Sequence, residues 1–318
     1  MKNIRWGIVS TGRISEQFAH DMQFVNNGEL SAVAARNIDD AADFAKKHNI
    51  EKCYQGYQTM FDDPDIDAVY IGTPHTFHFE QAFAAISAGK GVLCEKPITV
   101  SSEQCLQLSL LAKEKEVFLM EAMWTYFLPA INKAKAWIEE GRIGTIKHIK
   151  ADFGYPIEYS PNSREYSADL AGGCLLDMGI YPLAIASFFA EKDLENLNVI
   201  AHLAPNGVDD DVIVTANCGD IKVTLATSFQ CRLRNSAYII GDKGYIVIPD
   251  AFRAFECSLY VLDDLIDHFD DKRESIGLQF EAEHAGEQML KGKTESDVMP
   301  HQQSLLLQTQ MEKIKALF

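Results

Sequence analysis

The feature that most constrains the fold is an alternation of short apolar runs and amphipathic stretches over the first third of the chain. Apolar, often β-branched side chains dominate residues 4–10, 30–35, 68–72, 91–94 and 117–121. Between these runs, apolar residues recur at helical spacing over 14–25, 38–48, 77–88 and 101–115. Continuously apolar strands separated by helices indicate a parallel sheet covered on both faces. The sequence therefore predicts an α/β domain with a doubly wound parallel sheet.

The pattern changes after residue 122. A helical pattern at 127–140 is followed by strands with turn signals and few helices between them, at 146–154, 198–203, 212–218, 222–229, 236–240 and 245–248. Such runs of strands indicate an antiparallel sheet. Further helical patterns cover 175–189, 277–290 and 301–317. We therefore expect two domains, 1–122 and 123–318, the second an α+β domain built on a large, mostly antiparallel sheet.

Charge and cysteine content exclude several classes of protein. The chain has 46 acidic and 29 basic residues, a net charge of −17, and no basic patch that would attract nucleic acid or anionic lipid. The apolar runs fall short of the roughly 18 residues that span a bilayer, and the N-terminal run indicates a strand rather than a secretory signal. Seven scattered cysteines without metal-ligand spacing are typical of free thiols. We expect a cytoplasmic protein with no metal, membrane or nucleic-acid partner.

The turn after the first strand contains a partial dinucleotide-binding motif. Residues 10–15 read Ser-Thr-Gly-Arg-Ile-Ser, and only Gly12 matches the glycine pattern of the Rossmann fingerprint. Small serines at the other two positions still permit close approach of the backbone to a pyrophosphate at the helix N-terminus. On spacing alone, a dinucleotide site and an ordinary strand–helix turn are equally compatible with this motif.

Two further strand ends favour a nucleotide site. Arg36 follows the second strand, where NAD-specific proteins usually carry an acid, and a guanidinium at this position suits a 2′-phosphate. This favours NADP over NAD, the alternative being a solvated arginine that opens a helix. Glu95-Lys96-Pro97 ends another strand, although a surface ion pair beside a turn is the commoner explanation of such a pair.

Several segments together resemble one family. These are residues 5–10 (Arg-Trp-Gly-Ile-Val-Ser), 95–97 (Glu-Lys-Pro), 120–124 (Met-Glu-Ala-Met-Trp) and 172–181, with its Gly-Gly and Asp-x-Gly-x-Tyr elements. The chain resembles the glucose–fructose oxidoreductase/inositol dehydrogenase (Gfo/Idh/MocA) superfamily, and within it the dimeric dihydrodiol dehydrogenase and NADP-dependent D-xylose dehydrogenase branch. Serine in place of the first fingerprint glycine also occurs in that branch.

The resemblance implies a Rossmann domain, a second domain on a mostly antiparallel sheet, and roles for individual residues. Lys96 corresponds to the active-site lysine of the family, and its peptide bond to Pro97 is expected to be cis. Tyr181 corresponds to the acid/base of the dihydrodiol branch, and Asp177 to the acid one helical turn earlier. The expected substrate-pocket aromatics are Trp124, Phe153 and, as a looser match, Phe280. The expected cofactor-binding residues are Ser10, Thr11, Gly12, Arg13, Ile14, Arg36, Thr73, Pro74, His75, His78, Glu95 and Lys96.

These residues suit the oxidation of an alcohol. A phenol with an unperturbed pKa near 10 is a poor base at neutral pH, but the Lys96 ammonium beside Tyr181 would favour the phenolate and stabilise a developing alkoxide. Asp177 would orient Lys96 or a substrate hydroxyl. Without the resemblance, Tyr181 would be read as a core tyrosine with a satisfied hydroxyl.

We therefore expect an enzyme that transfers a hydride between NADP and a secondary alcohol or hemiacetal of a small polyhydroxylated molecule, either a sugar or a cyclic trans-dihydrodiol. Two alternatives stay open: a catalytically silent NAD(P)-binding regulator, and an enzyme that uses the cofactor transiently for epimerisation or elimination. We also expect a homodimer through the C-terminal sheet, because strands 212–218 and 222–229 carry apolar side chains on both faces, with Val223 and Leu225 grouped with Ile213.

Overall fold

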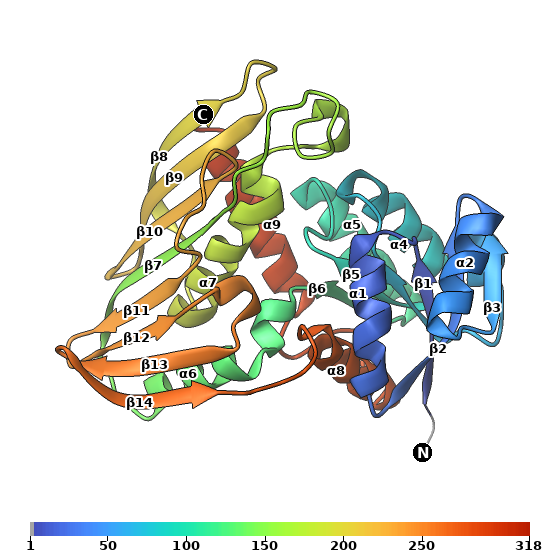
Figure 1. The fold of residues 1–318 in the computed structure, drawn as a ribbon, viewed down its shortest axis with the longest axis horizontal. Helices are drawn as coiled ribbons and strands as arrows, with labels where there is room; N and C mark the ends of the chain where they lie inside the picture. Colours follow the sequence, from blue (N-terminus) through green and yellow to red (C-terminus); the bar gives the residue numbers. More distant parts are fainter. Residues whose placement is uncertain (1–2) are drawn as a thin grey trace. The chain divides into compact units, whose positions relative to one another are not determined.

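The computed structural model describes residues 3–318 and divides into two compact units (Figure 1). Unit 1 comprises Met1–Trp124 and Glu274–Leu305, and unit 2 comprises Thr125–Arg273 and Leu306–Phe318. Residues 1 and 2, which open the expected first domain, lie outside the described residues. The division differs from a single boundary after residue 122, because the chain returns to unit 1 at Glu274.

Unit 1 contains the expected parallel sheet. Among the described residues its strand order is β3-β2-β1-β4-β5-β6, with every neighbouring pair parallel. The strands are β1 (Ile4–Val9), β2 (Gly28–Ala35), β3 (Lys52–Gln55), β4 (Ala68–Ile71), β5 (Gly91–Glu95) and β6 (Leu119–Ala122). This confirms the predicted doubly wound sheet. The edge strand β3 was not predicted, because its polar sequence, Lys-Cys-Tyr-Gln, lacks the apolar run of a buried strand.

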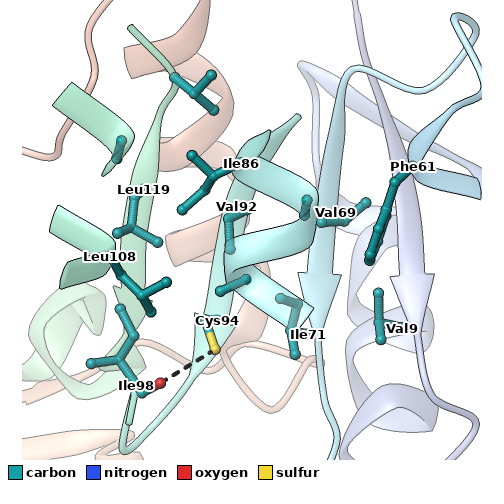
Figure 2. Packing of buried hydrophobic residues seen from close by; sticks show 14 of the residues in the cluster. Val9, Phe61, Val69, Ile71, Ile86, Val92, Cys94, Ile98, Leu108 and Leu119 are labelled. Atoms are coloured by element: carbon teal, nitrogen blue, oxygen red, sulfur yellow. Dashed lines mark hydrogen bonds between the residues drawn. The ribbon is translucent and has the colours of Figure 1, made fainter. Parts of the chain in front are cut away.

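Helices cover both faces of this sheet. They are α1 (Arg13–Asp21), η1 (Met22–Phe24), α2 (Ile38–His48), α3 (Gln58–Phe61), η2 (His75–Phe77), α4 (His78–Ser87), α5 (Ser102–Lys115) and α8 (Leu278–Leu290). On one face, Val9, Ile71 and Val92 pack with Ile86 of α4 and Leu108 of α5 (Figure 2). On the other, Tyr70 stacks on Phe18 of α1 at a centroid distance of 3.7 Å. The alternation of these contacts follows the period of two of a strand.

The return of the chain to unit 1 has a specific cause. The buried carboxylate of Asp21, at the end of α1, accepts the backbone N–H groups of Ile276 (3.3 Å), Gly277 (2.9 Å) and Leu278 (2.9 Å). It therefore satisfies donors that an α-helix leaves unpaired at its N-terminus, here that of α8. These bonds join residues about 255 positions apart, which no local pattern in the sequence reveals.

Unit 2 is built on the expected second sheet, with order β14-β13-β12-β11-β7-β10-β9-β8 among the described residues. The strands are β7 (Ile146–Gly154), β8 (Glu195–Leu203), β9 (Asp209–Cys218), β10 (Ile221–Ser228), β11 (Ala237–Gly241), β12 (Tyr245–Ile248), β13 (Glu256–Val261) and β14 (Asp264–Asp270). Only the β10–β7 pair is parallel, which confirms a mostly antiparallel sheet. The sequence analysis missed β13 and β14.

The remaining helices are η3 (Trp124–Phe127), α6 (Pro129–Glu139), η4 (Ala168–Leu170), the π-helix η5 (Leu175–Gly179), α7 (Ile180–Ala190), η6 (Ala251–Arg253) and α9 (His301–Lys315). Helix α7 packs on β7, β10 and β11, and α6 on β12, β13 and β14. Both lie on one side of the eight-stranded sheet (Figure 1). The other side of that sheet is open in the described part of the chain.

The register of the β9–β10 hairpin corrects one expectation about this open face. Val223 lies opposite Ala216, and Leu225 lies opposite Val214. Residues directly opposite each other share a face of the sheet, so Val223 and Leu225 are buried together with Val214 rather than grouped with Ile213 on the other face.

One helical segment contradicts the expectation that every apolar run is too short to span a bilayer. Residues Ala168–Ala190 are long and apolar enough by length and composition to cross a membrane. However, 78% of the most apolar window is buried within the protein, as in the core helix of a globular domain.

Unit 1 contains a buried acid that makes its stability depend on pH. Glu121 of β6 is 2% exposed, and its Oε1 accepts the Ile98 N–H at 2.9 Å. Burial raises the pKa of Glu121 to about 7. As the pH rises from about 5 to about 7, the unfolded chain releases this proton while the folded chain keeps it, so the free energy of unfolding falls.

We predict that Glu121→Gln reduces this loss of stability between about pH 5 and about pH 8 by roughly 3 kcal/mol, because glutamine keeps an acceptor for Ile98 and does not titrate. Urea unfolding at the two pH values measures the change. Glu114→Gln, at an exposed position of α5, serves as the control and should follow the wild type. Parallel curves for wild type and Glu121→Gln would contradict the assignment.

Candidate active site

The carboxyl end of β1 has the backbone shape of a dinucleotide-binding turn. Ser10 adopts a φ of 102°, a conformation that glycine reaches without the steric cost of a Cβ. The Ser10 Oγ accepts the Gly12 N–H at 3.1 Å. This bond, made by a serine where the fingerprint has its first glycine, stabilises the same turn. Thr11 lies within it, and α1 begins at the exposed Arg13.

At the last fingerprint position, a serine in the helix packs against a glycine at the end of a neighbouring strand. Ser15 is fully buried in α1, where the fingerprint usually has a small residue for close helix–strand packing. Across from it is Gly72 at the end of β4, where an added Cβ would lie 2.6 Å from Ser15 Oγ and 3.2 Å from Ile14 Cγ2. In this chain, the glycine that permits close helix–strand packing therefore lies at the end of β4 instead of in the helix.

These features fit a nicotinamide dinucleotide. Gly12 is the N-cap residue of α1 and carries no side chain that would cap the helix, so the first turn presents backbone N–H groups of the kind that bind a pyrophosphate. Strands β2 and β4 flank β1 on opposite sides, which makes this the topological switch point where such ligands bind. Arg36 is exposed directly after β2. Burial raises the pKa of nearby Tyr57, and the Arg36 charge opposes that rise.

The turn that carries Lys96 is held at three consecutive residues. The Lys96 N–H donates to Glu95 Oε2 at 3.2 Å, and the Ile98 N–H donates to Glu121 Oε1 at 2.9 Å. Between them, the Pro97 carbonyl oxygen lies 2.8 Å from His78 Nδ1. The Lys96–Pro97 peptide bond is cis, which confirms that expectation. The lysine therefore projects from a fixed backbone at the carboxyl end of β5.

His78 has a structural role that was not predicted. It is 1% exposed, and its Nε2 lies 2.8 Å from the Thr73 carbonyl oxygen, so both ring nitrogens face backbone carbonyls. Burial lowers the pKa of His78 to about 4, so at pH 7 the ring is neutral, carries one N–H and donates to only one of the two carbonyl oxygens. The imidazole ties the segment after β4 to the Lys96 turn instead of presenting a nitrogen to a cofactor.

The other cofactor-binding candidates expected after β4 lie next to His78. The Thr73 hydroxyl donates to Gln81 Oε1 at 2.6 Å. Pro74 precedes η2, and His75, 5% exposed, begins it. The His75 ring lies 6.2 Å from the His78 ring in an edge-on arrangement.

In unit 2, the expected acid/base lies in a cluster of aromatic rings. The Tyr181 ring is edge-on to Phe153 at 5.4 Å and to Phe252 at 5.8 Å. Phe153 and Phe252 stack on each other at 4.2 Å. Tyr181 lies near the start of α7, directly after the π-helix η5. π-Helical turns of this kind are frequent at functional sites. Sequence reasoning missed Phe252, because a lone phenylalanine in η6 gives no signal.

Asp177, expected to orient Lys96 or a substrate hydroxyl, has a partner within unit 2. Its two oxygens accept Arg164 Nη1 and Nη2 at 3.3 and 3.0 Å in a bidentate pair. Arg164 comes from the long segment between β7 and η4 and was not predicted. Bidentate pairs are geometrically specific, so this one fixes the segment against η5.

The Gly-Gly element and the acidic run 209–211 form one packed structure. A Cβ on Gly173, whose φ is 132°, would overlap Asp209 Oδ1. Asp209 Oδ2 accepts the Leu175 N–H at 2.7 Å at the start of η5, and burial raises the pKa of Asp209. Asp210 is 6% exposed and lies 2.6 Å from His202 Nδ1. Asp209 and Asp210 are therefore packed inside unit 2 rather than solvated.

The structure thus groups the expected site residues by unit. The cofactor candidates gather at the carboxyl edge of the unit 1 sheet, and Tyr181, Asp177 and Phe153 gather in unit 2. Trp124 is the last residue of the first segment of unit 1, and Phe280, half-buried, lies on α8. Among residues 3–318 there is no cluster of three or more potential metal ligands, and the seven cysteines form no disulfide.

Comparison with known proteins adds independent information. Residues 4–123 match the model of the Gfo/Idh/MocA oxidoreductase family with an NAD-binding Rossmann fold, and residues 131–247 match its C-terminal domain. Trans-1,2-dihydrobenzene-1,2-diol dehydrogenase from Xenopus laevis is 34% identical over 322 residues, covering 97% of this chain and 96% of the relative. The enzyme of that name from Homo sapiens is 33% identical over 328 residues, covering 98% and 96%.

Solved structures show the same fold. Aldose-aldose oxidoreductase from Caulobacter crescentus superposes with a TM-score of 0.89 at 20% identity, covering 99% of this chain and 97% of that chain. A 3-ketoreductase from Actinomadura kijaniata, solved with NADP and TDP-benzene, gives 0.87 at 24% identity, covering 99% and 98%. The family models cover most of the chain and the curated relatives nearly all of it, so this chain belongs to the Gfo/Idh/MocA oxidoreductase family.

Proposed function

We propose that this chain is an NADP-dependent dehydrogenase or reductase acting on a secondary alcohol or hemiacetal of a small polyhydroxylated molecule, a sugar or a cyclic trans-dihydrodiol. The observation that carries the proposal is the fixed Lys96 turn at the carboxyl end of β5, in a family of NAD-binding oxidoreductases. The substrate class rests on relatives named as dihydrodiol dehydrogenases. The bound nicotinamide supplies the hydride chemistry. We further propose a cytoplasmic location, which the seven cysteine thiols, none of them in a disulfide among the described residues, support.

Individual residues of the chain would have the following roles in the reaction. The Tyr181 hydroxyl exchanges a proton with the substrate oxygen. The Lys96 ammonium donates a hydrogen bond to that oxygen and stabilises its developing negative charge. Phe153 and Phe252 hold the Tyr181 ring in one orientation and present apolar surface to the carbon skeleton of the substrate. Asp177, bound to Arg164, orders the segment beside η5.

The first prediction concerns the cofactor. Arg36→Ala should weaken NADP binding by about ten- to a hundredfold while changing NAD binding little, because the lost charge-assisted bonds to the 2′-phosphate are worth roughly 1.5 to 3 kcal/mol. Fluorescence titration of the reduced cofactors measures both affinities. Lys46→Ala, at an exposed position of α2, removes the same charge and should leave the ratio unchanged. Equal losses for both cofactors would refute the assignment.

A second prediction concerns the catalytic pair. Tyr181→Phe should lower kcat by about 10² to 10⁴ while folding and cofactor affinity persist, because only the ionisable oxygen is lost. Lys96→Met should cost at least as much, and the double variant should lose far less than the two losses multiplied, since the residues act as a unit. Steady-state kinetics with sugars and cyclic diols measure these losses.

The matched control for the catalytic pair is Tyr238→Phe, which removes a phenol from β11 and should keep full turnover. Near-native turnover in Tyr181→Phe would show that another group moves the proton. Binding of NADP without turnover of any polyol by the wild type would instead favour a sensor, and product formed without net change in cofactor would favour epimerisation or elimination.

A third prediction concerns assembly, which we propose to be a homodimer through the open face of the eight-stranded sheet. Ile200 and Ile213 lie opposite each other on β8 and β9 and are 66% and 41% exposed. Tyr245 and Tyr260 stack at 5.0 Å on β12 and β13. Such a surface is typical of an interface. Ile213→Lys should convert the dimer to a monomer in light scattering at micromolar concentration, whereas Leu110→Lys, on exposed α5 of unit 1, should not. A monomeric wild type would contradict the proposal.

A further inference from the structure

Glu281 is an unusual buried acid in unit 1. It lies on α8, its side chain is fully buried, and within residues 3–318 neither Oε1 nor Oε2 has a hydrogen-bond partner. An isolated ionised carboxylate in such surroundings would carry a large desolvation penalty, so a group of this kind keeps its proton.

The neighbours of Glu281 strengthen this conclusion. Helix α8 packs against α1, η1, β2 and β5. The charged groups that act on the Glu281 carboxyl are Asp21 of α1 and Glu95 of β5, both acids, and burial together with these two charges raises its pKa well above the usual range. Tyr70 of β4 is also within electrostatic reach, and Glu29 of β2 is exposed. No cation acts on Glu281 among these described groups.

Hydrogen bonding decides which of the neighbouring acids carries the proton. Asp21 accepts three backbone N–H groups. Glu95 accepts the Tyr70 hydroxyl at 2.5 Å on Oε1 and the Lys96 N–H at 3.2 Å on Oε2. Donors aimed at a carboxylate favour its ionised form. Asp21 and Glu95 therefore have the environment of anions, whereas Glu281 has that of a neutral acid.

We propose that Glu281 is a positioning residue that keeps its proton at neutral pH and so leaves Glu95 as the ionised carboxylate that holds the Lys96 turn. Two buried carboxylates that act on each other, as Glu281 and Glu95 do, would compete for one proton. If Glu281 ionised, Glu95 would take up a proton or move, and the bond from the Lys96 N–H would weaken. The functional part of this inference rests on the proposed role of Lys96.

The proton itself can be observed without substrate or cofactor. Infrared difference spectra at pH 7 between wild type and Glu281→Gln should show loss of the carbonyl band of a protonated carboxylic acid. Glu287→Gln, an exposed acid on the same helix paired with Lys291, should lose carboxylate bands instead. In Glu95→Gln the acid band of Glu281 should titrate at lower pH, because one neighbouring charge is gone. Loss of carboxylate bands in Glu281→Gln, or an unmoved titration in Glu95→Gln, overturns the proposal.

The positioning role is tested by kinetics. Glu281→Gln, neutral and of equal size, should keep kcat near the wild-type value at pH 7. The ratio of its kcat to that of the wild type should stay near one while Glu281 is protonated and rise at alkaline pH once Glu281 ionises, by up to about tenfold for each pH unit above the pKa of Glu281. The ratio cancels groups that titrate in both proteins. A purely structural acid would lower stability without this trend, and a flat ratio overturns the positioning role.

The infrared and the kinetic experiments together distinguish a failure of this inference from a failure of the proposed function. If the wild type shows no NADP-linked turnover of any polyol, the proposed function is refuted, and the infrared spectrum still decides whether Glu281 holds a proton. If turnover is present and the acid band is absent, the proposed function stands and the Glu281 inference is wrong.

Discussion

The carboxylate of Asp21 is the interaction on which unit 1 depends. By accepting the three N–H groups at the start of α8, it brings residues 274–305 back onto a sheet that otherwise ends at residue 122. Helix α8 then covers the side of the sheet that carries Tyr70 and brings Glu281 close enough to act on Glu95. A charge-assisted acceptor that satisfies several donors is among the stronger hydrogen-bonding arrangements in proteins. Its loss would expose both the helix terminus and a buried acid.

The Lys96 turn shows how side chains from three elements position a reactive residue by binding the main chain around it. Glu95, His78 and Glu121 each bind the main chain of a different residue within 96–98. The three side chains come from β5, α4 and β6, so the turn is fixed only when the sheet and its covering helix are both formed. Their burial explains why two of them have altered pKa values, Glu121 raised and His78 lowered. The cost of burying these polar groups is offset by the hydrogen bonds they make.

Sequence patterns predicted the strands that are buried on both sides and missed some that are polar and partly exposed. Strands β4 and β5 are completely buried, and their continuous apolar runs identified them. Strands β3 and β14 are partly exposed and polar, so they lacked that signal. The resemblance to a family directed attention to Lys96, Tyr181 and Asp177, but spacing gave no hint of Arg164 or Phe252. Contacts of that kind depend on which loops meet.

The sequence by itself determined the α/β class of unit 1, the change of architecture near residue 122, the family, and the candidates at strand ends, because period-two and period-3.6 patterns and short motifs are local properties. Tertiary structure decided the rest. It joined Asp21 to α8 across about 255 residues, turned His78 from a cofactor candidate into a tie between two loops, and placed Val223 and Leu225 on the buried face of their sheet. It also left both oxygens of Glu281 without a hydrogen-bond donor in the described part of the chain. Burial and partner choice arise only when distant segments pack, so no local pattern encodes them.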